Sequence, residues 1–136
     1  MTTRKRMNEA VQQAAEEIRS AHPGHTIDVL PDDDGGAFVK VHDLPLGSQY
    51  IPERSWVAFR ITFQYPFADV YPHYCVANLA RKDGRPLGGG FSQNTWKSPA
   101  GEQPATMMSR RSNQLNAATD TAALKLAKVL DWMKSQ

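Results

Sequence analysis

Cys75 is the only cysteine of the chain and its one candidate thiol nucleophile. A thiolate can attack an acyl group, and His73 would lie on the same face of a regular strand. Side chains alternate between the two faces of a strand, and this alternation nevertheless places Cys75 on the same face as the apolar residues Ala77 and Leu79. A buried free cysteine commonly acts as a small hydrophobic residue. We therefore expect Cys75 to fill the core, and it ranks as the runner-up nucleophile.

Hydroxyl and guanidinium groups follow one another in the segment Ser109-Arg110-Arg111-Ser112. A serine can accept an acyl group as an oxyester, and adjacent cations can stabilise the tetrahedral oxyanion. A serine hydroxyl needs a positioned base, and the sequence identifies none. The alternative is that Ser109 and Ser112 form turn or capping hydrogen bonds while the arginines bind carbonyl groups or solvent.

Apolar periodicity predicts a helix near each end of the chain. The second helix is predicted from about residue 118 or 119 to 134, with Thr119 as N-cap and Lys125 facing water. The first helix is predicted over residues 7–19, where four apolar residues at helical spacing share one face: Met7, Val11, Ala14 and Ile18.

Four strands are expected between these helices, as an antiparallel meander over about 26–30, 37–41, 57–63 and 74–80. Residues 84–105 contain five glycines and three prolines and are predicted to form a long loop. Trp96 in this loop would either pack the loop down or anchor a partner. The chain is thus predicted to be an α+β domain with helices packed on one antiparallel sheet.

Composition narrows the classes of function. The chain has 136 residues, 40% of them hydrophobic and 22% charged, with a net charge of +2. These values are typical of a single soluble domain, and we expect a cytoplasmic protein that does not bind membranes. The four histidines lack ligand spacing and Gly88-Gly89-Gly90 lacks the context of a phosphate-binding loop, so no metal or cofactor is expected. Nucleic acid is not expected either, because no exposed aromatic residues are interleaved with the basic pairs Arg81-Lys82 and Arg110-Arg111.

Several short motifs, taken in order, resemble the ubiquitin-conjugating-enzyme superfamily, which also includes inactive variants and RWD domains. Two of them, Leu44-Pro45-Leu46-Gly47 and the late Ser109-Arg110-Arg111 with Asp120, resemble a divergent bacterial branch of that superfamily. The motifs are the basic start of the first helix at residues 4–9, His22-Pro23-Gly24, Leu44-Pro45-Leu46-Gly47, the corner Tyr65-Pro66-Phe67 with Tyr71-Pro72, and Ser109-Arg110-Arg111 followed by Asp120. The chain departs from the family by lacking its His-Pro-Asn triplet and its downstream cysteine in residues 80–115.

The resemblance implies one domain over residues 1–136, with residues 1–6 as a flexible basic tail. It implies a protein that receives or positions a ubiquitin-like protein supplied by an activating enzyme. The family's nucleophile would fall near Met107–Ser109, so Ser109 first, or else Ser112, would carry an oxyester, assisted by Arg110 and Arg111. Arg4, Lys5 and Arg6 would meet the activating enzyme, where complementary charge raises the association rate. The alternative is a non-catalytic binding module that scaffolds a partner enzyme.

Overall fold

The computed structural model describes residues 6–136, and the chain forms an α+β fold with two helices and eight strands. Within these residues no helix combines the length and the apolar character that crossing a membrane requires. The elements in chain order are α1 (Glu9–Ala21), β1 (Ile27–Pro31), β2 (Ala37–Pro45), β3 (Tyr50–Ile51), β4 (Arg54–Ile61), β5 (His73–Val76), β6 (Ala80–Arg81), β7 (Phe91–Ser98), β8 (Gly101–Met108) and α2 (Ala122–Lys134).

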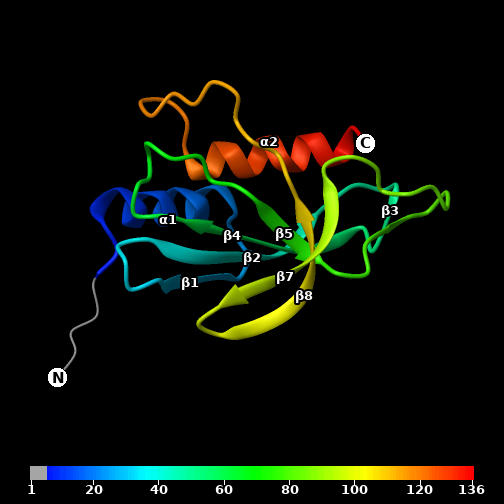
Figure 1. Cartoon of the computed structure of the whole chain (residues 1–136), viewed down its shortest axis with the longest axis horizontal. Helices are drawn as coiled ribbons and strands as arrows, with labels where there is room; N and C mark the ends of the chain where they lie inside the picture. Colours follow the sequence, from blue (N-terminus) through cyan, green and yellow to red (C-terminus); the bar gives the residue numbers. More distant parts are fainter. Residues whose placement is uncertain (1–5) are drawn as a thin grey trace.

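The main sheet has six strands in the order β1-β2-β4-β5-β8-β7, and every neighbouring pair is antiparallel. A separate two-stranded sheet pairs β3 with β6. Both helices lie on one side of the main sheet, and the β7–β8 hairpin curves away from them (Figure 1). Side chains of both helices and of the central strands form one buried core, which includes Ile18, Phe59 and Leu126.

The opposite face of the sheet carries no helix (Figure 1). It holds a second, smaller cluster in which Ala58, Trp96 and Ala105 are buried. Strand alternation produces this division: in β4, for instance, Phe59 faces the helices while the adjacent Ala58 belongs to the second cluster. We call this side of the sheet the open face.

Three sequence-based expectations about the fold were wrong. The sheet has six strands in place of a four-stranded meander, and most of the predicted loop at 84–105 forms the β7–β8 hairpin. The second helix begins at Ala122, where Thr121 caps it by accepting a hydrogen bond from the Leu124 amide over 3.1 Å, so Thr119 is not the cap. The first helix was predicted well, and its Val11, Ala14 and Ile18 are buried as expected.

The double Tyr-Pro segment forms the connection between β4 and β5. Tyr65 is buried, and its hydroxyl accepts a hydrogen bond of 3.2 Å from the Ala122 amide, at the first residue of α2. This bond satisfies one of the amides that a helix start leaves unpaired. The connection is therefore docked against the N-terminal end of α2, and this docking positions the cluster described next.

Candidate functional site

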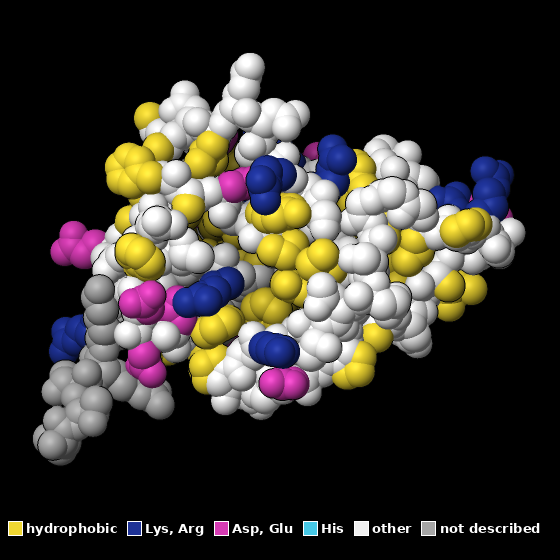
Figure 2. Space-filling view, in the orientation of Figure 1, with side chains coloured by type: hydrophobic (Ala, Val, Ile, Leu, Met, Phe, Trp, Pro, Cys, Tyr) yellow, Lys and Arg dark blue, Asp and Glu magenta, His cyan; other side chains and the backbone are white. Residues whose placement is uncertain are grey.

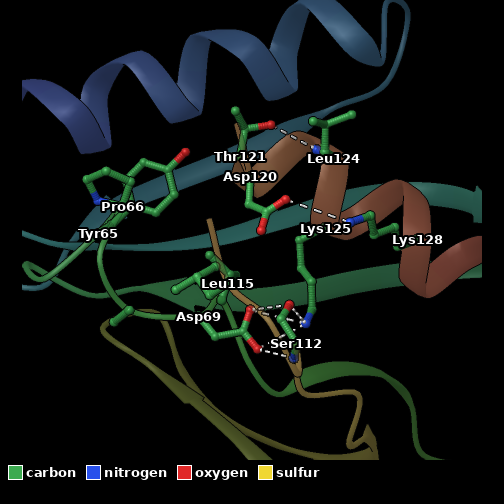
Figure 3. A pocket seen from close by; sticks show the side chains of 12 residues that line it. Tyr65, Pro66, Asp69, Ser112, Leu115, Asp120, Thr121, Leu124, Lys125 and Lys128 are labelled. Atoms are coloured by element: carbon green, nitrogen blue, oxygen red, sulfur yellow. Dashed lines mark hydrogen bonds and ion pairs between the residues drawn. The ribbon is translucent and has the colours of Figure 1, made fainter. Parts of the chain in front are cut away.

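Ser112, Asp69 and Lys125 converge from three segments that are far apart in the sequence (Figure 3). The Ser112 hydroxyl donates to Asp69 Oδ1 over 3.0 Å, and Lys125 Nζ donates to Ser112 Oγ over 2.8 Å. Lys125 Nζ also lies 3.1 Å from both carboxylate oxygens of Asp69. The Ser112 amide donates to Asp69 Oδ2 over 2.6 Å. A serine hydroxyl is thus held between a carboxylate and an ammonium group.

This cluster is largely shielded from water. The side chain of Lys125 is 9% exposed and that of Asp69 is 17% exposed. Burial alone would raise the pKa of Asp69, but hydrogen bonds from the Ser112 amide, Lys125 and the Ser112 hydroxyl hold that pKa below its ordinary value. Asp69 therefore stays ionised at neutral pH, where it can accept the Ser112 proton.

Local structure explains each position. Asp69 lies in the β4–β5 connection, between the two Tyr-Pro dipeptides. Lys125 lies one turn into α2, and its amide bonds the carbonyl of the N-cap residue Thr121 over 2.9 Å. Ser112 lies in the irregular segment between β8 and α2, and the hydrogen bonds to Asp69 hold it there.

Two exposed arginines directly precede Ser112 in the chain, and each lies over an aromatic ring. The Arg110 guanidinium is 4.9 Å from the ring centroid of Trp132, and the Arg111 guanidinium is 4.9 Å from that of Tyr71. Neither forms an ion pair with a carboxylate within residues 6–136. Both line a polar hollow of about 260 Å³ that also reaches Ser112 and Lys125. The hollow therefore presents uncompensated positive charge beside the serine.

The other predicted hydroxyl, Ser109, stands apart from this cluster. Its amide donates to the Gly90 carbonyl over 2.8 Å, at the end of the β7–β8 hairpin. Its own hydroxyl makes no hydrogen bond to any other residue of the described part of the chain. The structure therefore joins Ser112, and not Ser109, to a possible base.

Cys75 and His73 are both fully buried under the helices. Burial raises the pKa of the Cys75 thiol to about 12, so the thiol stays protonated and unreactive at neutral pH. His73 packs against Phe59 with ring centroids 4.9 Å apart, and neither of its ring nitrogens has a hydrogen-bond partner within residues 6–136. Burial lowers the pKa of His73 to about 3. The expected inward position of Cys75 is confirmed.

Two of the four residues predicted to bind partners, Arg6 and Trp96, fall within the described residues. Arg4 and Lys5 lie outside the described residues, and Arg6 is exposed. Trp96 is 5% exposed and packs against Phe38 and Tyr74 on the open face, so its indole is mainly a packing element.

Sequence reasoning missed Asp69 and Lys125. Lys125 was grouped with the water-facing lysines, yet it is 8% exposed and lies on the buried side of α2. The sequence position of Lys125 could have indicated its burial. Ala122, Lys125 and Val129 are three and four residues apart, which places them on the same side of a helix. Asp69 offered a weaker signal, as the one carboxylate of the Tyr-Pro connection.

Searches for similarity to families of proteins, to curated proteins and to solved structures found no match for this chain.

Proposed function

We propose that the chain is a conjugating-enzyme-like protein that accepts the C-terminal acyl group of a ubiquitin-like protein on Ser112. The observation that carries this proposal is the hydrogen bonding of Ser112 Oγ, which donates to Asp69 over 3.0 Å and accepts from Lys125 over 2.8 Å. A nucleophile held by a base on one side and a cation on the other has the arrangement that acyl transfer requires. The resemblance of the Tyr-Pro corner and the late Ser-Arg-Arg segment to the conjugating-enzyme superfamily supplies the substrate class.

The reaction would begin with a thioester that joins the ubiquitin-like protein to a cysteine of the activating enzyme. Ser112 Oγ attacks the thioester carbonyl carbon while its proton passes to Asp69. The C–S bond then breaks, and the thiolate of the activating enzyme leaves and takes up the proton. The product is an oxyester on Ser112, and no oxidant or reductant is needed.

The lowered pKa of Asp69 favours a thioester over an amide as the acyl donor. A carboxylate whose pKa lies below its usual value is a weak base. It can assist attack on an activated carbonyl group, but it gives little help against an unreactive amide. Lys125 would stabilise the negative charge that develops on the Ser112 oxygen, and Arg110 and Arg111 would face the oxyanion in the adjacent hollow.

A second function is supported by the same cluster. The Ser112 amide is bound to Asp69 as firmly as the hydroxyl is, and these bonds tie the segment after β8 to the β4–β5 connection. A cluster that fastens three segments together suits a non-catalytic module that positions a ubiquitin-like protein or its activating enzyme. The two functions differ in whether Ser112 ever becomes acylated.

A glycylglycine thioester of 2-mercaptoethanesulfonate is a suitable probe, because it tests Ser112 without the natural partner. We expect intact-protein mass spectrometry to show one added acyl group that hydroxylamine removes and a thiol does not. Ser112→Ala should abolish the adduct, whereas Ser109→Ala and Cys75→Ala should keep it. Absence of any adduct on wild type would overturn acyl transfer in favour of the binding module, and a thiol-labile adduct would implicate Cys75.

A further inference from the structure

The open face of the sheet gathers aromatic and basic side chains that are scattered through the sequence. Arg60 lies over the Phe38 ring at 5.1 Å from its centroid, and Lys40 Nζ lies over the Trp56 ring at 4.5 Å. These residues come from β2 and β4, which are paired in the sheet. The interleaving of rings and cations that the linear sequence lacks is therefore produced by strand pairing.

A groove of about 630 Å³ runs along this face and ends beside the edge strand β7. Trp96 forms its floor, with the Tyr74 ring centroid at 5.1 Å and the Phe38 ring centroid at 6.0 Å from that of the indole. Tyr74, Phe38 and Tyr71 remain partly exposed, so each offers ring surface to a bound group. Flat aromatic ligands can stack on such rings.

The polar residues that line the groove favour an anionic ligand. Arg60 and Lys97 supply positive charge, Asn94 and Thr95 supply amide and hydroxyl groups, and no lining residue among those described is acidic. Arg60 also pairs with the Asp32 carboxylate over 2.8 Å, so the positive charge of the lining that has no ion-pair partner is that of Lys97. Lys97 forms no ion pair within residues 6–136, although Glu102 lies opposite it in the β7–β8 register.

Charge is also distributed unevenly over the face of the molecule seen in Figure 2. In Figure 2 most of the acidic side chains visible lie toward the left end, near the described start of the chain, while Lys and Arg are spread along its length. On the face seen in Figure 2, a polyanion would therefore meet most carboxylate repulsion at that end.

We propose that the groove on the open face binds a short segment of single-stranded nucleic acid. Bases would stack on Tyr74, Phe38 and Tyr71, while Lys97 and Arg60 would contact phosphates, and Asn94 would hydrogen-bond base edges. Stacking on aromatic rings combined with backbone contacts from cations is the general mode of single-strand recognition. An acidic peptide would satisfy the cations but would leave the exposed rings without a stacking partner, so the rings favour bases.

The inference is independent of Ser112, which lies on the helix-covered side. Ser112→Ala should therefore bind nucleic acid like wild type, and failure of one proposal leaves the other standing.

Fluorescence anisotropy with fluorescein-labelled oligo(U) and oligo(dT) of 12 nucleotides tests the proposal on the full chain. We expect micromolar binding in 50 mM salt, with log K falling against log[salt] at a slope of about −1.4, as two contacted phosphates predict. Tyr74→Leu should weaken binding about tenfold through lost stacking, and Tyr74→Phe should not. Lys97→Glu replaces an exposed side chain and should also weaken binding at least fivefold, whereas Lys82→Glu, at a residue that follows β6 and does not line the groove, should leave binding unchanged.

Thermal unfolding of each variant separates lost binding from lost folding, and Lys97→Glu keeps the test valid if Tyr74→Leu unfolds. The proposal is overturned if wild type shows no binding at 100 µM protein, if duplex DNA or polyglutamate binds as tightly as the single strands, or if Lys128→Glu weakens binding as much as Lys97→Glu does. The last result would move the contact to the hollow beside Ser112.

Discussion

The charged side chains on the two faces of the main sheet differ in how they are paired and in how far they are exposed to water. On the helix-covered side, Lys125, Asp69 and Ser112 satisfy one another almost completely out of water. On the open face, Lys40 and Arg60 lie over aromatic rings, Arg60 also pairs with the Asp32 carboxylate, and Lys97 is exposed without an ionic partner within residues 6–136. A cation enclosed with its counter-ion contributes to holding the fold together, whereas an exposed cation without a counter-ion, such as Lys97, remains available to a ligand. The experiments below test this division.

Replacing one lysine on each side of the main sheet should give the largest difference in the free energy of unfolding. Lys125→Met leaves the largely buried Asp69 carboxylate without its ammonium partner, and we expect a loss of about 3 kcal/mol in the free energy of unfolding. Lys40→Met removes a hydrogen bond to Gln103 and a contact with the Trp56 ring, and should cost less than about 1 kcal/mol. Urea denaturation at pH 7 measures both. Equal losses would show that the two lysines play the same structural role.

The buried His73 should make the free energy of unfolding depend on pH. In the folded chain burial holds the pKa of His73 at about 3, while the unfolded chain takes up the proton as the pH falls through 6.5. The contribution of His73 is therefore complete above pH 6.5 and is lost progressively as the pH falls toward 3. Between pH 6 and pH 4 the loss approaches about 1.4 kcal/mol per pH unit.

His73→Leu should remove this slope, and urea denaturation between pH 6 and pH 4 measures it. The partly exposed His25→Gln is the matched control and should keep it. Lys125 and Asp69 also act electrostatically on His73, so the slope is best compared in the variant and wild type at equal salt. An unchanged slope in His73→Leu would assign acid sensitivity to other groups.

The two serines of the segment after β8 should differ in their effect on stability. Ser112→Ala removes one hydroxyl from the cluster but leaves the Lys125–Asp69 ion pair intact, so we expect a loss of about 1 kcal/mol. Ser109→Ala removes a hydroxyl without a hydrogen-bond partner in the described residues and should change stability by less than about 0.5 kcal/mol. Thermal unfolding of the pair measures this difference, and a larger loss for Ser109→Ala would contradict the assignment.

The elements with strong periodicity were predictable. Helix α1 and strand β4 followed their apolar patterns, because each buries one side against the same core. The β7–β8 hairpin had no such pattern, since β7 is an edge strand in which Trp96 is the one buried residue. Pro104 in β8 also argued for a loop, but β5 pairs only with Ala105–Met108, so no ladder bond from β5 falls at Pro104.

The candidate site was predictable only in part. The segment containing Ser112 was identified, but the choice between Ser112 and Ser109 depended on Asp69 and Lys125, which lie 43 and 13 residues away from Ser112 in sequence. Their proximity arises from the docking of the Tyr-Pro connection on the start of α2, through Tyr65 and Ala122. No local pattern encodes a contact between such distant segments.

Arg111 is where the two sides of the molecule meet. It lines the hollow beside Ser112, and its guanidinium lies over Tyr71, which lines the groove of the open face. Because this contact is exposed, a double-mutant cycle of Arg111→Gln and Tyr71→Leu should give a coupling energy of only about 0.5–1 kcal/mol in urea denaturation. Arg110→Gln with Tyr71→Leu is the matched control and should give none, since Arg110 lies over Trp132. Because Arg111 is proposed to face the oxyanion, Arg111→Gln should lower acylation of Ser112 directly, so binding of oligo(U) is the measurement that tests the link between the two sides. Weaker binding of oligo(U) in this variant would show that Arg111 serves both sides, whereas unchanged binding would show that the groove acts independently of Arg111.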